Sequence, residues 1–288
     1  MNTIKTTFLL TAMTLLLLFI GGALAGRGGL VLAMIVAILM NGSAYFFSDK
    51  IALKSAGAVP ISREESPRLY AVMERLAAKA NLPMPKLYLV PQPAPNAFAT
   101  GRNPSHASVA VTQGLMELMN DDELEGVIAH ELSHVRNYDI LTSSIAATLA
   151  GAITLIAQFG RFGAMFGGSG YGGGRSRDNG GALVALLMLF LAPLGALLLQ
   201  MGISRSREYQ ADATGVQMVG HANGLISALE KLGAYNQRIP SNIPPTTAAL
   251  CIVQPMMIKQ FFSGLFSTHP PLSDRIAVLR NMTIVPTR

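Results

Sequence analysis

The sequence predicts an α+β fold in which a mainly helical polar part with a small β-sheet is joined to about four transmembrane helices. Half of the 288 residues are hydrophobic and only 13% are charged, a composition too apolar for an ordinary soluble protein. Four long windows contain no charged residue. Between them, residues with helical spacing alternate with short runs rich in β-branched side chains, which predicts helices beside a few strands.

The four uncharged windows are each long enough to cross a bilayer, because a membrane helix needs about 20 apolar residues. They are residues 6–26, 28–48, 140–160 and 179–204. The first window has an alternative interpretation as a cleaved secretory signal that ends at Ala23-Leu24-Ala25. Its length, and the second span that follows at once, favour a membrane helix.

The third and fourth windows also have an alternative interpretation. The loop between them carries Arg161, Arg175 and Arg177. These residues would lie outside the cell if both windows cross the membrane, against the positive-inside rule. A buried or re-entrant helical hairpin therefore remains open for residues 140–204.

Basic residues set the predicted orientation. Lys50, Lys54 and Arg63 follow the second span, so the polar segment after it is expected in the cytoplasm. The expected parts are two membrane helices in 1–48, a cytoplasmic part in 49–139, the hydrophobic pair in 140–204 and a C-terminal part in 205–288.

The net charge of +6 does not predict a nucleic-acid partner, because the basic residues are scattered and largely flank the apolar windows. These basic residues are instead expected to contact the lipid bilayer. The single cysteine, Cys251, cannot form an internal disulfide.

The polar segments predict several helices and short strands. A capping box of Ser62 and Glu65 predicts a helix that ends near Asn81. Strands are expected over 85–90 and 107–112, with Asn96, Ala97, Phe98 and Ala99 as a possible edge strand between them. Further helices are expected from Asn120, from Arg205 to Gly220, over 222–235 and after Pro271.

The sequence HELSH at residues 130–134 has the spacing of a metal site. His130 and His134 lie one turn apart on one helix face, so both can reach one zinc ion at about 2.0 Å. Glu131 is rotated by about 100° from His130, away from the ion and close to a water bound there, which suits a general base. The alternative is a pair of surface histidines on an amphipathic helix.

A catalytic zinc ion needs a third protein ligand and an open position. Glu208 is the candidate, because Asp212 follows one turn later and could orient a ligating histidine through its other ring nitrogen. The alternative is a solvated helix face on which both carboxylates pair with Arg205 and Arg207. Asp139 has two interpretations as well, an outer partner of a ligand or a residue at the membrane boundary.

The stretches HELSH, SREYQAD, NAFATG and HPP occur in an order that resembles the HtpX-like membrane metalloproteases, the family that also includes the CAAX prenyl proteases of the Ste24 type. The resemblance covers nearly the whole chain. It implies a gluzincin-type fold, one zinc ion held by His130, His134 and Glu208, and a catalytic Glu131. It also implies proteolytic quality control of misfolded or damaged membrane proteins.

The resulting hypothesis is a multi-pass zinc endopeptidase of the cell inner membrane whose active site faces the cytoplasm and whose substrates are polypeptides. The edge from Asn96 to Ala99 would pair with an extended substrate. The alternative is a membrane-embedded metal-binding scaffold or adaptor without peptidase activity.

The other histidines receive separate interpretations. By the resemblance, His269 donates a hydrogen bond to the oxyanion of the transition state, and the alternative is a loop histidine that caps or packs under the last helix. His106 and His221 are expected to be ordinary surface residues.

Overall fold

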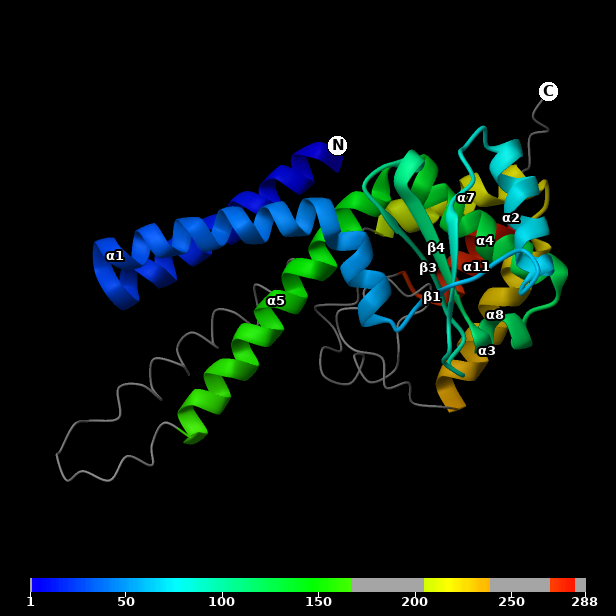
Figure 1. The fold of residues 1–288 in the computed structure, drawn as a ribbon. Coiled ribbons are helices and arrows are strands. Elements are labelled where there is room, and N and C mark those ends of the chain that lie inside the picture. Colours follow the sequence, from blue (N-terminus) through cyan, green and yellow to red (C-terminus); the bar gives the residue numbers. More distant parts are fainter. Residues whose placement is uncertain (1, 167–204, 239–269, 283–288) are drawn as a thin grey trace.

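The computed structural model describes residues 2–166, 205–238 and 270–282, and these form a mostly helical protein with a small mixed sheet (Figure 1). The helices are α1 Asn2–Ser55, α2 Pro67–Lys79, α3 Gln113–Leu118, α4 Asp121–Arg136, α5 Asp139–Phe166, α7 Arg205–Val219, α8 Asn223–Arg238 and α11 Leu272–Arg280. The strands are β1 Val59–Pro60, β2 Lys86–Val90, β3 Ala97–Gly101 and β4 Ala107–Thr112. A 3-10 turn, η1 Pro104–His106, precedes β4. The mainly helical α+β class predicted from the sequence is confirmed.

Helix α1 is a hairpin of two arms. Ala25 and Gly26 leave the helical backbone geometry, and Gly26 has a φ of 56°, a conformation that favours glycine. The arms touch at Gly21 and Gly29, because a Cβ on Gly29 would lie 1.9 Å from the carbonyl oxygen of Gly21. Figure 1 shows this hairpin, in blue, projecting away from the sheet.

Each arm of α1 is a candidate membrane span. Within the described residues, two segments are long and apolar enough to cross a bilayer, Ile4–Gly22 and Ala25–Ser55. They match the first two predicted spans. The third predicted window lies in α5, which is not one of these candidates, and the fourth lies outside the described residues. Of the four expected spans, the structure therefore supports two.

The first half of α5 packs against the α1 hairpin. Ile145 and Leu149 are fully buried against Leu9, Met13 and Ala44 of the hairpin. Thr142 also hydrogen-bonds Thr6 through their hydroxyl oxygens, which lie 3.1 Å apart. The apolar residues of this window are thus partly accounted for by contacts between helices.

Helix α2 begins later than the sequence predicts. Ser62 and Glu65 do bond each other, with the Ser62 N–H donating to Glu65 Oε2 at 2.6 Å, but they form a turn ahead of the helix. The helix itself starts at Pro67, with Ser66 as its N-cap. A proline suits the first helical position because its missing N–H would have no partner there.

The sheet has the order β1-β2-β4-β3, so β3 lies at an edge. Strands β2 and β4 run parallel, whereas β3 and β4 are antiparallel, with Ala97 opposite Val111 and Ala99 opposite Val109. The predicted edge strand around residues 96–99 is therefore present, displaced by one or two residues.

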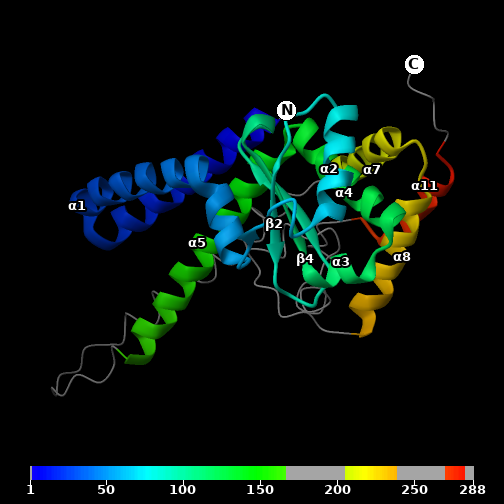
Figure 2. The same ribbon diagram turned by 45° about the vertical axis from the view of Figure 1, so that its right-hand side comes forward.

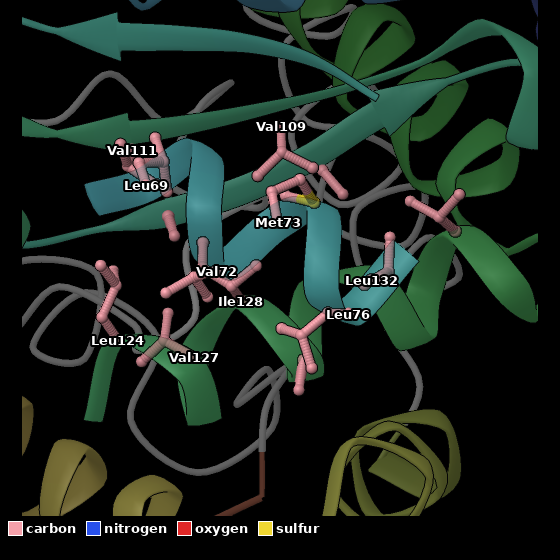
Figure 3. Close-up of a cluster of buried hydrophobic side chains, with 14 of the residues drawn as sticks. Leu69, Val72, Met73, Leu76, Val109, Val111, Leu124, Val127, Ile128 and Leu132 are labelled. Atoms are coloured by element: carbon pink, nitrogen blue, oxygen red, sulfur yellow. The ribbon is translucent and has the colours of Figure 1, made fainter. Parts of the chain in front are cut away.

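The two faces of the sheet pack against different layers. Val109 and Val111 face α2 and α4 in the main core, where Figure 3 shows them beside Leu69, Met73 and Ile128. Phe98 and Ala110 face the other way, toward Leu53 of α1 and Ala147 of α5. Alternating side chains explain this division. The sheet thus lies between the core helices and the ends of the apolar helices.

Helix α4 is the central helix of the core and also contacts α7 and α8 on its other side (Figure 2). Glycines permit the close approach. A Cβ on Gly126 of α4 would lie 2.6 Å from the backbone nitrogen of Leu225 in α8, and one on Gly215 of α7 would lie 3.1 Å from the nitrogen of His130. Helix α7 therefore lies directly against the backbone of the HELSH turn.

We expect Gly215→Val to separate α7 from α4 at His130, because the new methyl groups would meet rigid backbone. Overpacking of this kind costs about 1–3 kcal/mol and should lower Tm by roughly 5 °C. Thermal denaturation of the detergent-solubilised protein measures the effect. Gln217→Val, at an exposed position of the same helix, is the matched control, and an equal loss in both variants would point to helix propensity instead of the close contact.

Candidate metal centre

Helix α4 places the HELSH residues in the interior. Its start is defined by a capping box, in which Asn120 Oδ1 accepts from the Glu123 N–H and Glu123 Oε2 accepts from the Asn120 N–H, both at 2.9 Å. Three turns later His130 and Glu131 are buried, at 1% and 4% exposure. The two histidine side chains are only 1% and 17% exposed, so they are not surface histidines on an amphipathic helix, the alternative that the motif alone left open.

Helix α7 brings Glu208 to these histidines. Nε2 of His130 lies 3.7 Å from Glu208 Oε2, and Nε2 of His134 lies 3.7 Å from Glu208 Oε1. One donor atom from each of the three residues falls within 4.8 Å of the others. The structure therefore brings together all three predicted metal ligands.

A second carboxylate contacts the other ring nitrogen of each histidine. Asp212 Oδ1 lies 2.9 Å from His130 Nδ1, and Asp139 Oδ2 lies 3.3 Å from His134 Nδ1. An Nδ1–H that donates to a carboxylate leaves Nε2 unprotonated and directed at Glu208. Asp212 lies where the sequence predicts it, and Asp139 contacts a candidate ligand in addition to starting α5.

Two buried arginines complete the cluster, and the sequence reasoning missed both roles. Arg275 of α11 has no solvent exposure, and it donates to Asp212 through Nε at 2.8 Å and through one NH2 group at 2.6 Å. Arg207 lies 3.5 Å from Asp139. One feature of the sequence could have indicated the buried Arg275. It lies at helical spacing between Leu272 and Leu279, in an otherwise apolar stripe of the last helix. For Arg207 the sequence predicts only a pairing with Glu208 and Asp212 on a solvated helix face.

These contacts control the charges of the cluster. Burial lowers the pKa of His130, against the opposing effect of Asp212, so this ring stays neutral and able to bind a metal. Burial opposes ionisation of Asp212, but the charge and hydrogen bonds of Arg275 lower its pKa overall. Burial also opposes the charged form of His134, yet Asp139, Glu208 and Glu131 together raise its pKa. The centre is therefore rich in negative charge, which favours a bound cation.

Glu131 lies beside the three candidate ligands without belonging to their set. Its Oε2 accepts a hydrogen bond of 2.9 Å from the Ala99 N–H of β3. Burial raises the pKa of Glu131 to about 7, with a further increase from Glu208 and a decrease from His134. A carboxyl group whose pKa lies near neutral pH is suited to accept and return a proton.

The edge strand β3 thus reaches the centre through its backbone. The Thr112 N–H donates to the Asn96 carbonyl at 2.9 Å, so alternate residues from Asn96 onward bond β4. The Ala97 and Ala99 N–H groups then point away from β4, and that of Ala99 meets Glu131. The side chain of Phe98 lies on the face of the sheet that packs against α1 and α5.

The remaining histidines lie elsewhere. His269 lies outside the described residues, directly before Pro270 and α11. His106 lies in the turn before β4, where it contacts Arg102 and Asn103, and His221 lies in the short connection between α7 and α8. Neither of these two belongs to the cluster of candidate ligands.

The residues present fit a divalent metal ion. Two imidazole nitrogens and a carboxylate oxygen converge, each imidazole is oriented through its other nitrogen, and acidic groups outnumber the arginines. This donor set is one that proteins use for catalytic zinc.

Comparison with known proteins identifies a family of peptidases. Residues 63–283 match the family described as "Peptidase family M48". A "Protease HtpX homolog" of Desulfatibacillum aliphaticivorans is 53% identical over 278 residues, covering 96% of this chain and 89% of that protein. One of Campylobacter curvus is 49% identical over 284 residues, covering 98% of both.

The fold also resembles a solved structure. The crystal structure of S. mikatae Ste24p superposes with a TM-score of 0.50 at 21% identity, over 96% of this chain. The chain spans 65% of that longer protein, and at this low identity the likeness concerns the fold alone. The family match, the protease relatives and the buried ligand cluster lead to one conclusion: the chain belongs to peptidase family M48 and is a membrane metalloprotease.

Proposed function

We propose that the chain is a zinc-dependent endopeptidase of the gluzincin type, with His130, His134 and Glu208 as zinc ligands. The observation that carries this proposal is the convergence of their donor atoms within 4.8 Å, next to the buried Glu131. Nitrogen and carboxylate donors in a three-ligand set with an open position are typical of catalytic zinc. The protease names of the relatives disfavour the scaffold or adaptor alternative.

When bound, zinc supplies Lewis acidity that polarises the scissile carbonyl and activates a water molecule. Glu131 then acts as general base, taking the proton of the attacking water and returning it to the leaving amine. Its hydrogen bond to the Ala99 N–H fixes the carboxylate on the side of β3. Asp212 positions the His130 ring, and Arg275 keeps Asp212 ionised.

The substrate binds as an extended strand along the edge of β3, formed by Ala97, Phe98 and Ala99 after Asn96. The edge position of β3 and the outward direction of the Ala97 backbone groups support this role, while the Ala99 N–H is held by Glu131. Backbone hydrogen bonds depend little on the substrate's side chains, so this mode of binding suits broad specificity. A scissile peptide held there lies next to Glu131.

We further propose that the substrates are misfolded or damaged membrane proteins, and that the enzyme is a multi-pass protein of the inner membrane. The apolar hairpin α1, the lysines in its last two turns and the resemblance of the sequence to HtpX-like proteases support this assignment. The proposed parts are the membrane helices of 1–48, the cytoplasmic catalytic parts 49–139 and 205–288, and the hydrophobic segment 140–204 between them.

A transition-state role for His269 stays a prediction. Its support is the adjoining helix α11, which starts at Leu272 and brings Arg275 into the metal centre. A donor just ahead of this helix would complement the charge that develops on the carbonyl oxygen.

Glu131→Gln should retain zinc but lose cleavage, because the change removes the base and leaves the three ligands in place. We expect a fall in kcat/KM of at least about 10² to 10⁴-fold. Cleavage of a casein-like or unfolded membrane substrate measures activity, and elemental analysis measures zinc per chain. Glu125→Gln, on the same helix, is the control. Near-normal cleavage by Glu131→Gln would rule out this mechanism.

Zinc affinity should rank the ligand and its supporting residue. Glu208→Ala removes a donor atom and should weaken zinc most, whereas Asp212→Asn should weaken it by about 10 to 100-fold through loss of His130 orientation. Competition with a chelating dye measures both. Asp274→Asn, exposed on α11, should bind as the wild type does. Unchanged affinity in Glu208→Ala would remove Glu208 from the ligand set.

The proposed orientation predicts which side of the membrane each loop faces. In a Cys251→Ser background, Gly28→Cys at the tip of the α1 hairpin should react with an impermeant maleimide from outside the cell. A side chain at this position has open space, since a Cβ added to Gly28 would meet no neighbouring group within 4 Å. Glu64→Cys, exposed in the polar part, should react only after permeabilisation. The reverse pattern would invert the topology.

A further inference from the structure

A cavity of about 440 Å³ lies at the junction between α1 and the sheet, among residues that have no part in the metal centre. Its walls come from the end of α1 at Phe47 and Lys50, from the start of β2 at Lys86, and from the β3–β4 turn at Arg102. Segments distant in the sequence thus converge here, at the point where the apolar hairpin meets the polar part.

The helix side of this cavity has the composition of a membrane interface. Tyr45, Phe46 and Phe47 line it and are 39%, 56% and 50% exposed, at the end of the long uncharged run of the second candidate span. Aromatic residues concentrate where hydrocarbon gives way to lipid headgroups. The Lys50 ammonium lies 5.5 Å from the Phe47 ring centre, as for a lysine that extends toward the headgroups. This composition is the one expected of a cavity at headgroup depth.

The charges around the cavity are mainly positive. Lys50, Lys86 and Arg102 line it, against the single carboxylate of Asp49. Among the described residues, none of these three cations lies in an ion pair with a carboxylate. In the part of the chain that the structure describes, three cations thus lie around one cavity, with Asp49 as the one carboxylate in its lining.

The turn holds Arg102 in place. One NH2 group of Arg102 lies 2.8 Å from His106 Nε2, and His106 Nδ1 lies 2.8 Å from Asn103 Oδ1. A neutral ring that donates from Nδ1 and accepts at Nε2 satisfies both contacts. His106 therefore positions a guanidinium group in the cavity wall, a role that a plain surface residue does not have.

We propose that this cavity binds the headgroup of an anionic phospholipid. A phosphodiester accepts charge-assisted hydrogen bonds from lysine and arginine, and Arg102 offers paired donors of the right geometry. The exposed rings of Tyr45, Phe46 and Phe47 are available for the acyl chains and glycerol backbone, which a soluble phosphate lacks. Basic pockets beside membrane helices are a known setting for such lipids. The proposal needs only that α1 lies in the bilayer, and it is independent of the metal centre.

The test is lipid binding by the full-length protein in a neutral detergent micelle, where no charged bilayer surface contributes. Native mass spectrometry compares retention of phosphatidylglycerol with that of phosphatidylcholine. We expect the wild type to prefer phosphatidylglycerol. The combined variant Lys50→Gln, Lys86→Gln and Arg102→Gln should bind it about 1,000-fold more weakly, because each of the three charge-assisted hydrogen bonds is worth roughly a factor of ten.

Lys54→Gln is the matched control, since Lys54 is exposed on the same helix one turn beyond Lys50 and does not line the cavity. It should bind phosphatidylglycerol as the wild type does, and every variant should keep its Tm in detergent without lipid. An equal loss in Lys54→Gln, or no preference between the two lipids, would overturn the proposal. The proposal would also be overturned if glycerol phosphate raised the Tm of the protein as much as phosphatidylglycerol does, because a soluble phosphate would then be the ligand.

Discussion

The buried guanidinium group of Arg275 joins the metal centre to the fold. A fully enclosed charge is costly unless a partner of opposite sign meets it with good hydrogen bonds, and Asp212 does so through both of its oxygens. Asp212 also contacts His130, so one carboxylate links α11, α7 and α4. The orientation of a candidate metal ligand in the middle of the chain thus depends on the docking of its last described helix.

The second histidine has the same arrangement, but its supports come from the membrane side. Asp139 is the first residue of α5, and it lies between His134 and Arg207. One turn further along α5, Thr142 bonds Thr6 of the α1 hairpin. The apolar helices therefore pack directly onto the residues that orient His134. A shift of α5 relative to α4 would change the metal geometry, which gives a physical reason for the centre to lie at the base of the hairpin.

The sequence predicted those site residues that follow helical spacing. His130, Glu131 and His134 share one helix, and Glu208 and Asp212 share another, so periodicity alone shows that each group can face one point. Arg275 could not be assigned in this way, because it lies 63 residues beyond Asp212 and only tertiary packing brings them together. Two of the four expected membrane spans are supported within the described residues, and the other two stay predictions. Hydropathy does not distinguish an apolar face that meets lipid from one that meets other helices, and Ile145 and Leu149 pack on α1.

The proposed pairing of a substrate with β3 would give a physical reason for an enzyme of this kind to act on damaged proteins. An edge strand binds a substrate through backbone N–H and carbonyl groups, so the substrate must have these groups available. A folded membrane helix has none to offer, because every backbone group in the hydrocarbon region is already paired within the helix. A segment that has left its helix exposes them at the membrane surface. Strand β3 lies between Glu131, which its Ala99 N–H contacts, and the cavity wall at Arg102, which follows directly after the strand. Loss of secondary structure in the substrate, more than any side-chain motif, would then be the feature that this edge selects.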